Sequence, residues 1–185
     1  MLSQFTREHG KKALSDLDPL PKDIYPVGRL DFDSEGLLLL TNDKTINQLI
    51  LHPDNHHKKF YLVQLEGTPT ANELEQFRNG VEISVKGKKH QTLSAEIELI
   101  DRPSWITERN PPVSTNKPSS WVRIGLTEGK NRQVRKMTAK INHPTLRLIR
   151  ESIENISIIG LPPGRCMELS KNTFYKKLNI TPMDV

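Results

Sequence analysis

The chain lacks the features of secreted, membrane-spanning and thiolate-metal proteins. Cys166 is the only cysteine among 185 residues, which excludes an internal disulfide and a cluster of thiolate metal ligands and suits a reducing cytoplasm. No apolar run approaches the roughly 20 residues of a membrane-spanning helix, and residues 1–5 lack the layout of a signal peptide. We therefore expect a cytoplasmic protein with no membrane partner.

The apolar content is also low, at 35%. Apolar residues nevertheless recur in periodic blocks, which indicates a folded chain with a strongly solvated surface. Lys and Arg number 27 against 22 Asp and Glu, and the isoelectric point is near 9.3, a balance that favours a polyanionic partner such as nucleic acid. A net charge of +5 is equally compatible with an ordinary enzyme, so charge alone does not decide the function.

Several catalytic and metal-binding motifs are absent or incomplete. The Gly-x-Ser-x-Gly nucleophile elbow is missing. Residues 125–131 approach a phosphate-binding loop, but the glycines are too close together and Asn131 stands where Ser or Thr is required. Residues 31–36 imitate the start of a calcium-binding loop, yet Asn42 stands where a bidentate glutamate is needed. The histidines at 52–57 have no nearby thiolate, which favours a surface loop. We expect no metal site.

The segment 28–36, with the sequence GRLDFDSEG, leads directly into four leucines at 37–40. A short apolar run between turn residues predicts an inner strand that is buried on both faces. Burial of this run would draw the preceding charged side chains to the edge of the core, where the pKa of a carboxylate can be tuned. This segment is therefore the first candidate for a catalytic site. The alternative is a solvated acidic turn before a strand.

Periodicity and turn residues predict a mixed chain with several hairpins, which is typical of the α+β class. The expected elements begin with a helical turn within 11–17, a helix at 45–51, a strand at 58–67 and a helix capped by Thr70 and ended near Gly80. A hairpin of 81–85 with 92–100 around a basic turn at 86–90 follows, and then a long loop at 102–120. The last expected elements are a strand at 121–127, a helix at 132–141, paired strands at 146–149 and 153–159, and a final helix after Ser170.

The predicted helix at 132–141 has one apolar and one basic face. Val134, Met137 and Ile141 share the apolar face. A basic helix surface often serves solubility alone. The preceding glycine, however, leaves backbone N–H groups open, and a neighbouring arginine cluster is a second means of binding phosphates. The segment 130–140 is therefore a candidate for contact with a nucleic-acid backbone.

Three ordered motifs, at 28–38, 59–63 and 128–137, resemble the RsuA family of pseudouridine synthases, and the segments 109–112 and 144–150 look most like one of its large-subunit branches. The resemblance implies an α+β catalytic fold with two subdomains around a largely antiparallel mixed sheet and a central RNA-binding cleft. It also implies a single catalytic domain over 1–185, with approximate subdomains 1–57 and 58–185. We expect no S4 RNA-binding domain, and either a trimmed or a shortened start, since the family's upstream strand would fall before Met1.

The resemblance implies isomerisation of one uridine to pseudouridine in 23S ribosomal RNA, without a cofactor or metal. Asp31 would be the nucleophile, attacking either the ribose or the base, and Tyr61 would pack against the base. Arg135 would pair with the aspartate and favour its ionised form. Arg29 would help to displace the target base, because a planar guanidinium can fill the space that a flipped nucleotide leaves.

The partner implied by the resemblance is 23S ribosomal RNA, in the large subunit or an assembly intermediate, and the enzyme is expected to be a monomer. The expected catalytic residues are Asp31, Tyr61 and Arg135, and the expected RNA-binding residues are Arg29, Lys59, Lys130, Asn131, Arg132, Gln133 and Lys136.

Two other functions compete with this reading. A non-catalytic RNA-binding or ribosome-assembly protein would bind RNA with similar salt sensitivity, and only product formation separates it from an enzyme. A metal-dependent nuclease that uses Asp31, Asp33 and Glu35 would lose its activity to a chelator, whereas the synthase would not.

Overall fold

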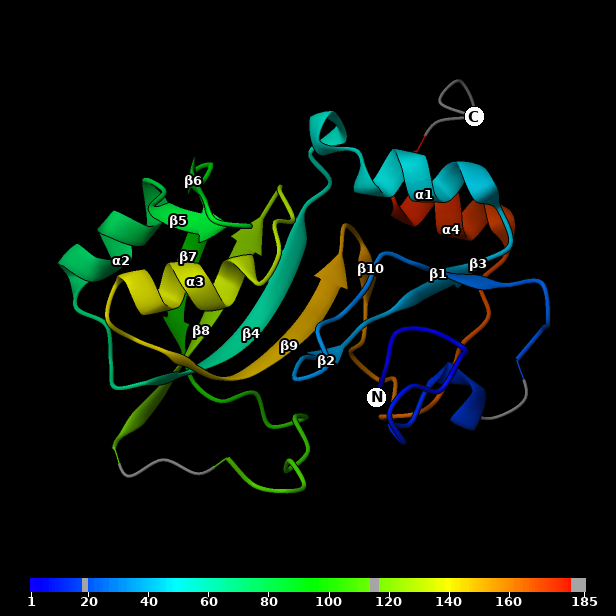
Figure 1. Cartoon of the computed structure of the whole chain (residues 1–185), viewed down its shortest axis with the longest axis horizontal. Helices are drawn as coiled ribbons and strands as arrows, with labels where there is room; N and C mark the ends of the chain where they lie inside the picture. Colours follow the sequence, from blue (N-terminus) through cyan, green and yellow to red (C-terminus); the bar gives the residue numbers. More distant parts are fainter. Residues whose placement is uncertain (18–19, 114–116, 181–185) are drawn as a thin grey trace. The chain divides into compact units, whose positions relative to one another are not determined.

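The computed structural model describes residues 1–17, 20–113 and 117–180 and divides the chain into two compact units (Figure 1). The first unit comprises Met1–His57 and Arg150–Val185, and the second comprises Lys58–Ile149. The expected approximate subdomains are 1–57 and 58–185, whereas in the structure the segment from Arg150 onward groups with the first unit.

A six-stranded sheet is the main β element, with the order β10-β9-β4-β8-β7 and with β2 beside β9. Its strands are β2 (Glu35–Gly36), β4 (Lys59–Glu66), β7 (Glu96–Ile100), β8 (Ser119–Leu126), β9 (Thr145–Ile153) and β10 (Ile156–Ser157). The β4–β8, β7–β8 and β9–β10 pairs are antiparallel. The boundary between the units falls within β9. The predicted α+β class with a largely antiparallel sheet is confirmed.

The first unit has its own core and a small sheet. Strands β1 (Tyr25–Val27) and β3 (Leu39–Thr41) pair antiparallel. Its helices are η1 (Leu14–Asp16), α1 (Lys44–Leu51), η2 (Pro53–Asn55) and α4 (Lys171–Lys177). One buried apolar cluster contains Val27, Leu37, Leu39, Ile46, Ile50, Ile153, Ile156, Leu178 and Ile180. Helices α1 and α4 lie side by side within this unit (Figure 1).

Asp43 joins the start of α1 to α4. Its carboxylate accepts hydrogen bonds from the Thr45 N–H at 3.0 Å and from the Tyr175 hydroxyl, and Lys171 Nζ lies 3.4 Å away. The Tyr175 hydrogen bond makes the largest contribution to holding the pKa of Asp43 well below its usual range. The residue that caps α1 therefore also fixes the position of α4.

The four leucines do not form the predicted inner strand. Leu37 and Leu39 are buried, whereas Leu38 and Leu40 are half-buried, and β3 belongs to a two-stranded sheet. Gly36, the last residue of β2, has a φ of +106°, and the Leu37 N–H donates to the Arg150 carbonyl of β9. Leu37 and Leu38 therefore lie outside the strands, Leu39 and Leu40 belong to β3, and only one face of β3 packs on the core.

The second unit is built on the long strands β4 and β8. It also contains α2 (Ala71–Arg78), β5 (Glu82–Val85), β6 (Lys88–Gln91) and α3 (Gln133–Lys140). Helices α2 and α3 cover one face of the sheet (Figure 1). The core between them includes Val63 of β4, Ile124 of β8, Phe77 of α2 and Met137 of α3.

The predicted hairpin of 81–85 with 92–100 is wrong. Strand β5 pairs with β6 in a separate two-stranded sheet, and β7 pairs with β8. Lys86 and Gly87 form the turn, with φ values of +52° and +79°. Two positive φ angles in a two-residue loop are what a tight hairpin turn requires, so the strand resumes at Lys88 and the expected longer turn does not form.

Most other predicted elements are confirmed. The four helices begin and end within a few residues of the expected positions, and the helical turn expected within 11–17 is η1. The strands expected at 146–149 and 153–159 differ, because β9 continues unbroken to Ile153 and Glu154, with a φ of +48°, starts the turn into β10. The long loop ends at 118, before β8, and its residues 114–116 lie outside the described residues.

Glu73 links the start of α2 to the segment before β9. It forms a capping box with Thr70, whose N–H donates to Oε2 at 2.7 Å, and His143 Nε2 lies 3.2 Å from the same oxygen. The Thr70 N–H, followed by the Thr70 hydroxyl and His143, lowers the pKa of Glu73 to about 2.

Replacing Glu73 by Gln should lower the melting temperature at neutral pH. A carboxylate whose pKa is lower in the folded state stabilises that state above its unfolded pKa, here 4.5, and loses this effect as the pH falls toward 2. The difference between wild type and Glu73→Gln in thermal unfolding should therefore be present at neutral pH and should shrink as the pH falls below 4.5 toward 2. Glu75→Gln, on the same helix, is the matched control. A difference that persists unchanged at the lowest pH would contradict the role of the Glu73 charge.

Candidate functional site

The turn that contains Asp31 is held at its N-terminal side by a buried serine. Ser3 Oγ accepts a hydrogen bond from the Leu30 N–H at 3.0 Å and lies 3.2 Å from the Leu30 carbonyl, to which it can donate. The Ser34 N–H then donates to the Asp31 carbonyl at 2.9 Å and closes the turn. The backbone on both sides of Asp31 is therefore fixed by hydrogen bonds, while its side chain stays partly accessible.

The C-terminal side of the same turn is attached to β9. The Leu37 N–H donates to the Arg150 carbonyl at 2.8 Å, and Arg150 Nε donates to the Leu37 carbonyl at 2.8 Å. Arg150 is only 6% exposed. A Cβ at Gly36 would lie 2.3 Å from the Arg150 carbonyl oxygen, so only glycine allows this approach. Asp31 thus projects from a segment that is attached by hydrogen bonds at both ends, to Ser3 and to Arg150 of β9.

The residue after Asp31, Phe32, has an exposed aromatic ring. Phe32 is 52% exposed, and the Lys11 Nζ lies 4.3 Å from the centre of its ring. Arg29 is exposed, and Asp33 and Glu35 are partly buried. The turn therefore presents a carboxylate, an arginine and an aromatic face within a few residues of one another.

In the second unit, Tyr61 and Arg135 lie on different elements. Tyr61 is on β4, opposite Ile124, and packs against the core while remaining partly exposed. Arg135 is on α3, and its Nη1 donates to the Thr145 carbonyl at 3.3 Å. The Thr138 hydroxyl lies 2.8 Å from the Thr145 hydroxyl. The first contact holds the Arg135 side chain at the start of β9, and the second joins α3 to the same residue of β9.

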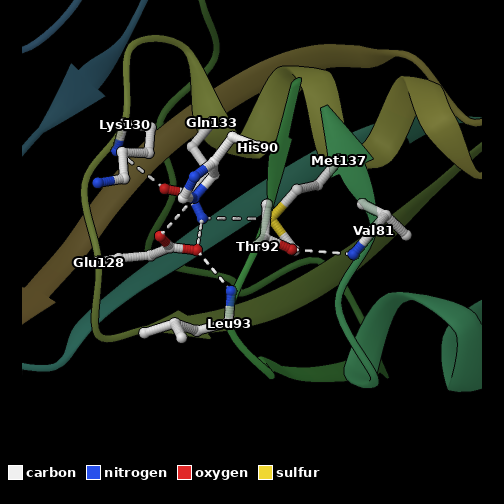
Figure 2. A network of polar contacts seen from close by, with 8 residues as sticks. All are labelled: Val81, His90, Thr92, Leu93, Glu128, Lys130, Gln133 and Met137. Atoms are coloured by element: carbon white, nitrogen blue, oxygen red, sulfur yellow. Dashed lines mark hydrogen bonds and ion pairs between the residues drawn. The ribbon is translucent and has the colours of Figure 1, made fainter. Parts of the chain in front are cut away.

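The predicted RNA-binding residues of this unit differ in exposure. Asn131 and Arg132 are exposed, Lys130 and Lys136 are half-buried, and Lys59 is buried at the first position of β4. Gln133 is only 4% exposed. Both ends of its side chain have partners inside the protein, since Oε1 accepts from the Lys130 N–H at 2.9 Å and Nε2 donates to Glu128 Oε1 at 2.5 Å (Figure 2).

Of the predicted site residues, Arg29 and Asp31 belong to the first unit, and all the others belong to the second. Ser3, Arg150 and Glu128 support these residues but carry no role that the sequence suggests. Their contacts join positions 27, 113 and 35 residues apart, and local sequence patterns hold no signal for pairs at such separations.

No metal-ligand cluster is found in the described part of the chain: among residues 1–17, 20–113 and 117–180, no three His, Cys, Asp or Glu side chains come together in a way that could hold an ion. Over the same residues, none of the helices combines the length and the apolar character needed to cross a membrane.

Comparison with known proteins identifies relatives over most of the chain. The family model described as RNA pseudouridylate synthase matches residues 2–140. Ribosomal large subunit pseudouridine synthase E of Vibrio parahaemolyticus is 48% identical over 170 residues, which cover 91% of this chain and 69% of the relative. The protein of the same name from Xanthomonas axonopodis pv. citri is 40% identical over 167 residues, which cover 88% of this chain and 85% of the relative.

A solved structure supports the same relationship. A crystal structure described as a pseudouridylate synthase has a TM-score of 0.71 at 26% identity, covering 89% of this chain and 65% of that chain. The resemblance predicted from the three motifs is confirmed, and so is the branch that the segments 109–112 and 144–150 indicated.

Replacing Gly36 by Ala should destabilise the Asp31 turn. The added Cβ would meet the Arg150 backbone at a φ of +106°, so strain and overpacking together should cost about 2–4 kcal/mol. The measurement is chemical denaturation, with Gly129→Ala as the control because a Cβ there meets no atom within 4 Å. Equal stability of the two variants would show that the turn does not depend on its approach to β9.

Proposed function

Because this chain belongs to the family of RNA pseudouridylate synthases, we propose that it isomerises a specific uridine of 23S ribosomal RNA in the large subunit. The proposed substrate rests on the 38–48% identity to four relatives that are named ribosomal large subunit pseudouridine synthase E. The partner is the RNA itself, in the large subunit or an assembly intermediate, and the enzyme acts as a monomer in the cytoplasm.

The reaction needs a nucleophile and a means of holding the free base, and no external reactant. The N-glycosidic bond of the uridine breaks, and the same ribose carbon then bonds to a carbon of the base. That carbon loses a proton and the released nitrogen gains one, so atoms and electrons balance without an oxidant, a reductant or a cofactor. Asp31 is the nucleophile in this proposal, and it attacks either the ribose or the base.

The attachment of the Asp31 turn suits this role. When a catalytic carboxylate is displaced by about 1 Å from its productive position, the reaction rate can fall by about 10²-fold. Ser3 and Arg150 fix the backbone on either side of the turn, so little conformational freedom is left to be lost when the uridine binds. The partly accessible Asp31 side chain can then reach a nucleotide that has left its stack.

Tyr61 and Arg135 are proposed as its catalytic partners. Tyr61 has a partly exposed ring on a strand that is packed against the core, and such a ring can stack on a uracil base. Arg135 carries a permanent charge, and a guanidinium near a carboxylate favours the ionised, nucleophilic form. Its contact with the Thr145 carbonyl fixes the direction of the side chain.

Binding of the RNA is assigned to the cations of both units. Arg29 is exposed two residues before Asp31, where it can occupy the space that the flipped nucleotide leaves. Lys59, Lys130, Arg132 and Lys136 are proposed to contact phosphates, and Asn131 and Gln133 lie in the same stretch of chain as the last three.

Replacing Asp31 by Asn or Ala should abolish pseudouridine formation, because the amide and methyl groups are not nucleophiles. The measurement is pseudouridine mapping of ribosomal RNA from a strain that lacks the gene, complemented with wild type or variant. Asp33→Asn is the matched control, since it removes a carboxylate from the same turn, and it should restore the modification.

Two outcomes would contradict this assignment. Restoration of the modification by Asp31→Ala would exclude Asp31 as the nucleophile. Failure of the wild type to form pseudouridine, with RNA binding retained, would favour a non-catalytic RNA-binding protein.

Treatment with EDTA should leave product formation unchanged when measured on purified enzyme and an RNA transcript. No step of the proposed isomerisation uses a metal, and Asp31, Asp33 and Glu35 are not required as a ligand set. The control is the same RNA refolded after chelation, with its structure checked by chemical probing. Loss of activity that returns only when a divalent ion is restored to the enzyme would contradict the mechanism.

A further inference from the structure

A buried carboxylate lies next to the loop 130–132, which precedes α3 and is called the basic loop below. Glu128 follows β8 and is only 7% exposed. Charged side chains are rarely buried to this extent unless they are paired, because an ionised group loses its hydration. Neither the proposed chemistry nor the proposed RNA contacts use Glu128, so its burial requires another explanation.

Glu128 connects three separate segments of the second unit. Its Oε1 accepts from the Leu93 N–H at 2.8 Å and from Gln133 Nε2 at 2.5 Å, and its Oε2 lies 3.1 Å from His90 Nε2. Figure 2 shows the side chains of Glu128 and Gln133 pointing toward one another, with the Leu93 N–H on the opposite side of the carboxylate. His90 is on β6, Leu93 follows it, and Gln133 opens α3.

Gln133 bonds both to Glu128 and to the backbone of the basic loop. Its Oε1 accepts from the Lys130 N–H at 2.9 Å, and its own N–H donates to the Lys130 carbonyl at 3.1 Å. Arg132 directly precedes α3 and is its N-cap residue. It has a φ of +52°, and its side chain makes no cap hydrogen bond to α3. An L-residue in this left-handed conformation is strained, so the loop needs an external restraint. The Gln133 side chain supplies it.

We propose that Glu128, acting through Gln133, is a positioning residue that fixes the backbone of 130–132 and the first turn of α3 for RNA binding and catalysis. This inference rests on the proposed function. The loop carries three of the proposed RNA-binding residues, and Arg135 follows two residues after Gln133 on α3. Glu128 itself touches neither RNA nor the reacting atoms. It orients the groups that do.

The test compares variants that remove or preserve these hydrogen bonds. Glu128→Ala removes all three contacts. Glu128→Gln keeps an oxygen for Leu93 and Gln133 and offers an amide N–H to His90. Gln133→Met breaks the connection to Lys130 but leaves Glu128 bound to Leu93 and His90. This last variant keeps the proposal testable if Glu128→Ala fails to fold.

Two measures distinguish a positioning role of Glu128 from a purely structural one. They are a control variant in the same region and an assay temperature at which every variant is folded. Thr92→Val removes the 2.9 Å hydrogen bond from the Val81 N–H to the Thr92 hydroxyl, which lies in the same region and does not involve Glu128 (Figure 2). Initial rates on an RNA transcript are measured for all variants at a temperature where circular dichroism shows each one to be fully folded.

The expected result is a fall of at least about 10-fold in kcat/KM for Gln133→Met and Glu128→Ala, since misplaced groups lose both binding and rate. Glu128→Gln should remain within about 3-fold of wild type, and Thr92→Val should lower the melting temperature without changing kcat or KM. Amide hydrogen exchange should show faster exchange at Lys130 in Gln133→Met and Glu128→Ala only.

Three outcomes would overturn the proposal. Wild-type kcat and KM in folded Gln133→Met would show that the connection is not needed. Equal losses in Glu128→Ala and Glu128→Gln would show that the charge, and not the hydrogen-bond geometry, matters. A loss of RNA affinity in Gln133→Met with unchanged exchange at Lys130 would show that Gln133 contacts RNA directly. A wild type without any product would instead refute the proposed function and would be recognised before any variant is compared.

Discussion

The reciprocal hydrogen bonds between Arg150 and Leu37 are the constraint on which the arrangement of the first unit depends. The Leu37 N–H bonds to the Arg150 carbonyl, and the Arg150 side chain returns to the Leu37 carbonyl. One residue of β9 therefore fixes the point at which the Asp31 turn ends and the apolar segment begins. Leu37 and Leu39 then enter the core together with Ile153, three residues after Arg150 on the same strand.

The same physical device recurs at the three positions that support the proposed site. Ser3, Arg150 and Glu128 are buried polar residues, and each bonds to backbone groups of a segment that is distant in the sequence. A buried polar group without a partner would cost about 1–3 kcal/mol, so each of these contacts is favoured over conformations that break it. The result is a set of short loops with few alternative conformations. The proposed isomerisation depends on such preorganisation, because the rate of the reaction depends on the placement of the reacting groups.

Membership of the pseudouridylate synthase family, the substrate proposed from its relatives and the geometry of each unit are mutually consistent. Asp31 lies on a fixed turn with an exposed arginine and an exposed aromatic ring nearby. The second unit carries the basic loop, α3 and a partly exposed tyrosine on β4.

Local patterns predicted the elements whose stability is local. The capping box at Thr70 and Glu73, the Ser170 cap and the apolar spacing of 134–141 each place hydrogen bonds or burial within a few residues, and the corresponding helices are found. The predictions failed where pairing partners compete. Strand β5 could pair with the segment directly after Gly87 or with the later strand β7. The positive φ angles at Lys86 and Gly87 form a tight turn, and β5 therefore pairs with β6. The leucine run likewise did not form one strand, since only Leu39 and Leu40 belong to β3.

The sequence by itself therefore indicated the α+β class and the family motifs, because these depend on residue type and short spacing, and the resemblance carried by those motifs implied the candidate nucleophile. Only the tertiary structure decided which residues hold that nucleophile and the basic loop in place. Ser3, Arg150 and Glu128 act across 27, 113 and 35 residues. The contacts that span these separations are made to backbone groups, so the side chains of the partner residues give no indication of them before the chain has folded.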